Sequence, residues 1–184
     1  MEMTAAEIDF DIFNVLDRVL HFEDTCSLQA DAWKKSKKSI TGVIENFFKQ
    51  CLEAHPDDPD GAVFGNPGSD CQIFQLQIYK TTSITDGLSV AFTIKCEDEK
   101  YYMCCTEDMK LYFKKGDCPD VIAGNRSEII FFQKEFSEGN SYFKFQSSLQ
   151  ADYYLAVSDE GGKQKLILQK SEGLNERQKF NIEW

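Results

Sequence analysis

Histidine is scarce in this chain and glycine-rich phosphate loops are missing, which limits the chemistry open to it. Only His21 and His55 occur among 184 residues, whereas nucleophilic catalysis by cysteine or serine needs a histidine base close by. His21 lies in an acidic N-terminal segment and His55 adjoins a Pro-Asp turn. No loop of the type that cradles phosphate is present. We therefore expect a protein that is not an enzyme and binds no cofactor.

Long apolar runs and a basic excess are also lacking. No stretch approaches the roughly 18 apolar residues of a membrane span, and the first residues lack the basic start of a secretory signal. We therefore expect a chain made in the cytosol, without membrane insertion. Aspartate and glutamate outnumber lysine and arginine by 31 to 20, a net charge of −11. This argues against nucleic acid as a partner, because phosphate binding needs a basic surface.

The seven cysteines include no CxxC pair. An odd number without metal-type spacing is typical of a cytosolic chain, so the cysteines are interpreted mainly as free thiols. Zinc at Cys96, Cys104 and Cys105 is not expected, because vicinal cysteines on a strand point to opposite faces and a fourth ligand is missing. No metal site is predicted. The sequence leaves open whether three cysteines oxidise outside the cell: Cys26, Cys51 and Cys118.

A sharp change of charge divides the chain near residue 31. Residues 1–31 hold eight acidic side chains against one arginine, and four lysines follow within residues 34–38. A composition break of this kind is typical of a linker or a processing site. We predict an acidic propeptide, residues 1–31, and a main domain, residues 32–184, which is long enough for one hydrophobic core. An ordinary acidic-to-basic linker is the alternative.

The residues at this break fit a protease that cuts after aspartate. Leu28, Gln29 and Ala30 precede Asp31, and the small Ala32 follows it. Such an enzyme binds the aspartate carboxylate, commonly with paired arginine donors, and holds the preceding residues as an added strand. We predict cleavage between Asp31 and Ala32, with the three preceding residues as the recognition sequence.

The same tetrapeptide recurs at residues 149–152, where bulky Tyr153 follows. This copy lies between two predicted strands, so we expect it to form part of a hairpin that cannot enter a protease cleft. Asp31 should be cut and Asp152 spared.

Apolar spacing predicts an all-β domain behind a short amphipathic element. The element lies within residues 5–24, is expected to be helical from about residue 11 to residue 20, and needs another surface to cover it. From residue 39 onward, short apolar runs alternate with turn residues. Twelve strands are predicted: 40–47, 50–54, 62–64, 72–79, 89–96, 101–105, 109–114, 128–133, 141–146, 153–158, 165–169 and 179–183. Alternation along two of them points six side chains inward: Ile73, Leu76, Ile78, Val90, Phe92 and Ile94.

A weak internal repeat favours one β architecture. Residues 93–96 and 101–103 recur as residues 144–147 and 153–155, and residues 110–113 are echoed by residues 165–168. Three units of four strands would account for residues 39–184. A six-stranded barrel capped by three hairpins, the β-trefoil, fits that count, and a sandwich is the alternative.

Several of these runs resemble the interleukin-1 cytokine family, over nearly the whole chain. The most specific is Ser-Glu-Ile-Ile-Phe-Phe-Gln-Lys at residues 127–134. Others in register are residues 43–46, 68–71, 78–80, 94–97 and 165–168. The divergence indicates a non-mammalian or otherwise distant member.

The resemblance implies a β-trefoil cytokine made as an inactive cytosolic precursor without a signal peptide. An inflammatory caspase would cut it, and the family's cleavage aspartate falls on Asp31. The product would leave by a non-classical route as a monomer and bridge two receptor chains with immunoglobulin domains. A soluble decoy binding protein is a further candidate partner.

The resemblance also assigns receptor-facing positions. The family's charges on the first strand fall on Glu45 and Lys49, with signs opposite to those of mammalian members. A loop arginine and methionine of the family become Asp86 and Leu88. The charge is kept at four positions: Lys80, Lys114, Glu128 and Lys134. The alternative for each is a solvated surface charge of little energetic value.

Two other functions stay open at this point. A receptor antagonist or an intracellular member of the family would share the fold, because agonism depends on surfaces without a motif. A β-trefoil lectin or protease inhibitor is less favoured. Lectins of the ricin type carry a Gln-x-Trp signature, and neither Trp33 nor Trp184 fits it.

Overall fold

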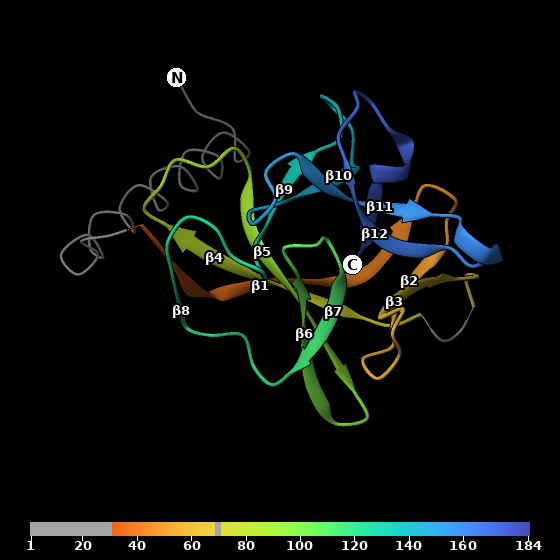
Figure 1. Ribbon diagram of the computed structural model, residues 1–184, viewed down its shortest axis with the longest axis horizontal. Helices are drawn as coiled ribbons and strands as arrows, with labels where there is room; N and C mark the ends of the chain where they lie inside the picture. Colours follow the sequence, from red (N-terminus) through yellow and green to blue (C-terminus); the bar gives the residue numbers. More distant parts are fainter. Residues whose placement is uncertain (1–30, 69–70) are drawn as a thin grey trace, which may run out of the picture.

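The computed structural model describes residues 31–68 and 71–184 (Figure 1). The expected amphipathic element and the recognition residues Leu28, Gln29 and Ala30 lie outside the described residues. Within those residues the fold is all-β, with thirteen strands and two short 3-10 helices. No helix in this part of the chain is long and apolar enough to span a bilayer.

The elements follow one another along the chain in this order. They are β1 (Ala32–Asn46), β2 (Cys51–Ala54), β3 (Ala62–Gly65), β4 (Phe74–Thr81), β5 (Leu88–Cys96), β6 (Glu99–Cys105), β7 (Leu111–Lys115), β8 (Val121–Ala123), β9 (Phe131–Glu135), β10 (Phe143–Ser147), β11 (Tyr153–Ser158), η1 (Glu160–Gly162), β12 (Lys165–Lys170), η2 (Glu176–Gln178) and β13 (Phe180–Glu183).

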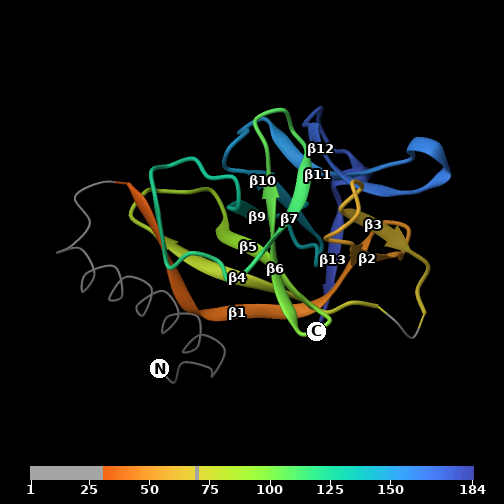
Figure 2. The same ribbon diagram turned by 60° about the horizontal axis from the view of Figure 1, so that its bottom comes forward.

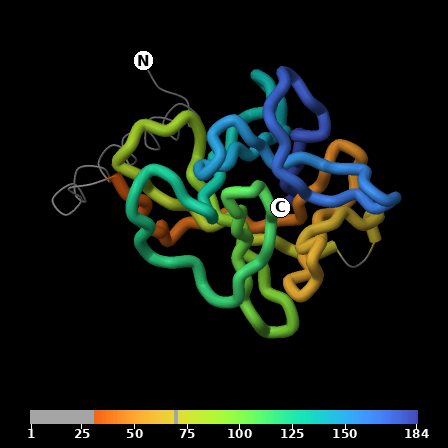
Figure 3. The backbone as a smooth tube through the Cα atoms, in the orientation of Figure 1, coloured from red at the N-terminus to blue at the C-terminus, as the bar shows by residue number. Residues whose placement is uncertain are grey.

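Six strands close into a barrel. β1 pairs with β4, β4 with β5, β5 with β9, β9 with β10 and β10 with β13, all antiparallel. The tube in Figure 3 shows the last segment returning to the first, where β13 pairs with β1 and completes the ring. Three hairpins, β2–β3, β6–β7 and β11–β12, extend the three units. The predicted β-trefoil is confirmed, and closure of the ring excludes the sandwich.

Aromatic side chains fill the centre of the barrel. Phe92, Phe131, Phe145 and Phe180, from four of the ring strands, are at most 1% exposed. Phe92 meets Phe145 edge to face at 4.9 Å between ring centroids and Phe131 at 5.5 Å. Such pairs contribute about 0.5–1.5 kcal/mol each beyond the burial of their area. Four of the fifteen phenylalanines therefore meet where the ring strands converge.

The first strand begins at Ala32, eight residues earlier than predicted. It runs along one side of the barrel beside β4 (Figure 2). The period of two breaks where the register shifts between Lys35 and Ser39. The buried Gln77 side chain donates to the carbonyls of Ser36 and Lys38 in this bulge. An irregular, lysine-rich stretch hides its strand character, so the linker alternative is wrong for residues 32–38.

Two further predictions need correction. Ile73 was predicted to point inward but is 63% exposed. The side chains of β4 that face the core are Phe74, Leu76 and Ile78, and because alternate residues of a strand share a face, position 73 lies on the other side. The short strand β8 was not predicted; its three residues pair with the start of β1.

The interpretation of the cysteines as free thiols is wrong for one pair. Cys51 and Cys71 form a disulfide with 5.8 Å between their Cα atoms. The two residues are 20 positions apart, and only the tertiary fold brings them together, so spacing alone gave no signal. Four other cysteines in the described part are free: Cys96, Cys104, Cys105 and Cys118.

Candidate functional site

The bond between Asp31 and Ala32 lies at the very start of β1. Asp31 is exposed, but both of its acceptor groups are engaged by the domain. The Ser83 hydroxyl donates to Asp31 Oδ1 at 2.9 Å, and the Gly124 amide donates to the Asp31 carbonyl oxygen at 2.7 Å. A protease must take over both groups, so these contacts have to open before the bond can be cut.

The residues that follow this bond are held more firmly. Ala32 pairs with Ala123 of β8, and Trp33 pairs with Ile122 on one side and Thr81 on the other. The Trp33 side chain is 2% exposed and donates its indole N–H to the Ser89 hydroxyl at 3.2 Å. β1 is therefore formed from Ala32 in the uncut chain, and cleavage is not needed to order it.

The second copy of the tetrapeptide, residues 149–152, forms the turn between β10 and β11. Its carbonyl groups are taken up by the fold: Arg126 donates to Leu149 O at 2.7 and 3.1 Å, and the Ser171 amide donates to Asp152 O at 2.9 Å. Tyr153 N donates back to Gln150 O at 2.9 Å, which closes the turn. This geometry is incompatible with the extended strand that a protease cleft requires.

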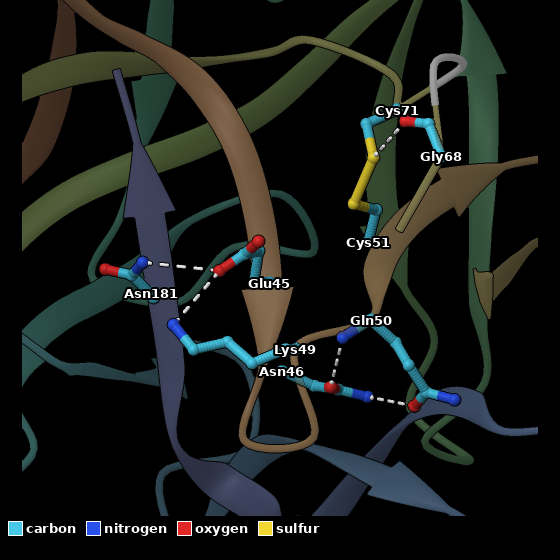
Figure 4. Close-up of a disulfide and its surroundings, with 8 residues drawn as sticks. All are labelled: Glu45, Asn46, Lys49, Gln50, Cys51, Gly68, Cys71 and Asn181. Carbon is cyan, nitrogen blue, oxygen red and sulfur yellow. Dashed lines mark hydrogen bonds and ion pairs between the residues drawn. A yellow bond between two sulfur atoms is a disulfide. The ribbon is translucent and has the colours of Figure 1, made fainter. Parts of the chain in front are cut away.

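The receptor-facing positions inferred from the resemblance fall into three groups. The first is at the β1–β2 turn (Figure 4), where Lys49 Nζ lies 3.4 Å from Glu45 Oε2. The Asn181 side chain donates to the same oxygen at 3.4 Å. The carboxylate of Glu45 is the main cause that raises the pKa of Lys49. The two reversed charges therefore neutralise each other in the free protein.

The second group surrounds the β4–β5 loop. Lys134 Nζ lies 2.9 Å from Asp86 Oδ2, and Leu88 pairs with Gln133. Gly87 sits between them with φ +130°, and a Cβ there would lie 2.7 Å from the Gln133 carbonyl oxygen. A side chain at position 87 would clash with this oxygen, so only glycine lets the β4–β5 loop come this close to β9. The close approach keeps Asp86 next to Lys134. Lys80 and Leu88 line one hollow along residues 78–89.

Replacing Lys134 with methionine is expected to raise the pKa of Asp86 toward its ordinary value of 3.8. The hydrogen bond from Lys134, and then its charge, are the causes that lower this pKa. A carboxyl whose pKa is lower in the folded than in the unfolded protein stabilises the fold at pH values above the unfolded pKa. This stabilisation is lost as the pH falls through the folded pKa. Carboxyl NMR titration measures the shift.

Lys100→Met is the matched control for this titration. Lys100 lowers the pKa of Asp117 through a similar pair at 2.8 Å, so its removal should shift Asp117 and leave Asp86 unchanged. An Asp86 pKa that does not move in Lys134→Met would contradict the pairing.

The third group, Lys114 and Glu128, lines a hollow between β7 and the segment leading into β9. The Tyr112 hydroxyl donates a hydrogen bond to Glu128 Oε2 at 3.5 Å. Beneath them, burial raises the pKa of the Cys104 thiol to about 12. The acid is thus held at the surface over an unreactive, protonated thiol.

One surface feature was not predicted from the sequence. The Lys179 ammonium lies over three rings, 4.2 Å from the centroid of Tyr142, 5.0 Å from Phe47 and 5.5 Å from Phe136. Contacts of this kind are worth roughly 0.5–1 kcal/mol at exposed sites. Phe48 and Leu174 lie exposed beside this cluster and line one hollow with Phe47. The adjacent Phe47-Phe48 pair at the end of a strand was the available signal.

Candidate metal ligands do not converge in the structure. Within residues 31–68 and 71–184, no group of three or more His, Cys, Asp or Glu side chains is arranged to hold a metal ion.

Comparison with known proteins points to one family. The model of the family described as Interleukin-1 / 18 matches residues 67–182. Interleukin-18 of Gallus gallus is 36% identical over 163 residues, which cover 82% of this chain and 79% of that protein. Interleukin-18 of Homo sapiens is 31% identical over 179 residues, which cover 92% of this chain and 90% of that protein.

Solved structures support the fold. The crystal structure of chicken interleukin-1 beta superimposes with a TM-score of 0.62 at 16% identity, and the match covers 82% of this chain and 98% of that one. A mutant of the same chicken cytokine gives a TM-score of 0.65 at 16% identity, with coverage of 83% and 99%. At this identity the likeness concerns the β-trefoil alone.

Proposed function

The chain belongs to the Interleukin-1 / 18 family, and from this premise we propose that it is the precursor of a pro-inflammatory cytokine that an inflammatory caspase activates by cutting after Asp31. The observation that carries the proposal is the position of Asp31. It is exposed immediately before the first strand, β1, and it ends a segment that holds seven of the eleven net negative charges.

Cleavage has a direct electrostatic consequence. Hydrolysis of the Asp31–Ala32 amide separates the acidic segment, residues 1–31, from the lysines of residues 34–38. The loss of a net charge of −7 beside a basic run changes the field around the start of β1. We propose that the acidic segment covers part of the receptor-binding surface until this bond is cut.

The released domain, residues 32–184, would bridge two receptor chains with immunoglobulin domains. The three groups of receptor-facing residues offer separate areas for them: Glu45 with Lys49, Asp86 and Leu88 with Lys80 and Lys134, and Lys114 with Glu128. The cytosolic precursor would leave the cell by a non-classical route, and a soluble decoy protein would compete for the same areas.

A reporter cell that carries both receptor chains tests this function. Protein cut after Asp31 is expected to signal at a concentration at least about tenfold lower than uncut protein, the ratio that about 1.4 kcal/mol of masked binding would give. The Asp31→Ala variant, treated with the same protease, is the control. Its signalling potency should remain that of the uncut protein. Equal potency of cut and uncut protein would remove the proposed activation step.

A further inference from the structure

The disulfide between Cys51 and Cys71 joins the start of β2 to the segment that leads into β4 (Figure 4). Cys51 opens β2 and is 2% exposed, whereas Cys71 is half-buried on the approach to β4. Next to it, the Gln72 side chain accepts from the Ala54 amide at 2.7 Å and donates to the Ala54 carbonyl at 3.3 Å. The segment is therefore fixed to β2 at two points, one covalent and one through a side-chain amide.

The same strand end carries the first receptor-facing group. Cys51 is the register partner of Glu45, the single residue pair between β1 and β2. Gln50, its chain neighbour, accepts from the Asn46 amide at 3.0 Å and its side chain accepts from Asn46 Nδ2 at 2.8 Å. A constraint on Cys51 thus acts directly on the turn that holds the Glu45–Lys49 pair.

The other described cysteines are poorly suited to oxidation. Cys104, Cys105 and Cys118 are buried, and burial raises the pKa of Cys104 to about 12 and that of Cys118 to about 11. Because the thiolate is the reactive form, these thiols stay protonated and inert near neutral pH. Burial also raises the pKa of the half-buried Cys96.

We propose that Cys51 and Cys71 form a redox-dependent clamp, a dithiol in the cytosol and a disulfide after the protein reaches an oxidising environment. Closure of the clamp fixes residues 71–73 against β2 and so stiffens the β1–β2 turn. The change of compartment rests on the proposed function, whereas the clamp itself rests on the geometry of this pair.

The chemistry is thiol–disulfide exchange with a low-molecular-weight disulfide such as glutathione disulfide. The more accessible Cys71 thiolate attacks it and one glutathione thiolate leaves. Cys51 then attacks the Cys71 sulfur of the mixed disulfide and displaces the second glutathione. Two electrons pass from the cysteines to glutathione disulfide, and the two thiol protons go to solvent. In the dithiol form, the Cys71 thiol can donate a hydrogen bond to the Gly68 carbonyl oxygen, which lies 3.5 Å from Cys71 Sγ.

The test uses the full chain in glutathione buffers of cytosol-like and extracellular-like ratio. Alkylation followed by peptide mass mapping is expected to find both thiols free in the first buffer and the Cys51–Cys71 peptide in the second. The oxidised protein should melt roughly 5–10 °C higher than the reduced protein, the range expected for closing a loop of this length. Amide hydrogen exchange at residues 45–52 and 71–73 should slow on oxidation.

Matched variants separate the clamp from general effects of oxidation. Cys71→Ser replaces the half-buried partner and should remove the dependence of melting temperature and exchange on the buffer, even if Cys51→Ser fails to fold. Cys96→Ser should respond like the unaltered chain. A disulfide that persists in the cytosol-like buffer, that links other cysteines, or that leaves exchange unchanged would overturn the proposal. None of these measurements uses a caspase or a receptor, so failure of the reporter assay would leave the clamp intact.

Discussion

Replacing Asp31 with alanine is expected to lower kcat/KM for caspase cleavage by about a thousandfold or more. An enzyme site built to bind a polar side chain strongly rejects a substrate that lacks this side chain. The enzyme's arginine donors would be left without the carboxylate they bind. Mass analysis of the fragments measures the effect: the unaltered chain should yield one new N-terminus at Ala32, and the variant should stay intact.

Asp152→Ala is the control for this experiment, because the same Leu-Gln-Ala-Asp sequence ends at both positions. Cleavage of this variant should match that of the unaltered chain. The β10–β11 turn is closed by the bond from Tyr153 N to Gln150 O, and its Leu149 and Asp152 carbonyls accept from Arg126 and Ser171. Asp31 instead lies immediately before β1, where it accepts from Ser83 and Gly124. A cut after Asp152 in folded protein would show that local structure does not select the site.

Trp33→Ala is expected to lower the free energy of unfolding by about 3–5 kcal/mol, the usual cost of truncating a buried aromatic side chain. Trp33 packs in a cluster with Tyr79, Ala91, Tyr102 and others that is separate from the core containing the barrel phenylalanines. Its removal leaves a cavity there and leaves the Ser89 hydroxyl without its donor. Denaturant unfolding followed by fluorescence or circular dichroism measures the loss.

The second tryptophan provides the comparison. Trp184 is 78% exposed, so Trp184→Ala should change the free energy of unfolding by no more than about 0.5 kcal/mol. If the two variants were equally stable, residues 32–38 would behave as the linker that the charge break first offered as an alternative.

The strands that the sequence predicted well are those with regular alternation. Val90, Phe92 and Ile94 are all buried in β5, and every predicted strand overlaps an observed one. Closure of the barrel was beyond the sequence, because it depends on pairs such as Phe143 with Phe180 that link distant strands. The same reason hid the Cys51–Cys71 bond, and the bulge after Lys35 hid the first half of β1.

The candidate site was only partly accessible from the sequence. The charge break located Asp31 without any fold, since composition changes along the chain. Which receptor-facing residues touch each other was not accessible, because Asp86 meets Lys134 across 48 positions and depends on the absence of a side chain at Gly87. The aromatic rings around Lys179 likewise come from two separate stretches of chain, the β1–β2 turn and the β9–β10 connection.

The depth at which Trp33 is anchored bears on how uniform the finished polypeptide is. An exopeptidase needs a free, unpaired amino end to thread into its active site. Behind the cut, Ala32 and Trp33 are paired with β8, and Trp33 also with β4, so trimming from that end stalls almost at once. The strand pairing itself thereby fixes the length of the released domain at its amino end, and no dedicated cap is required.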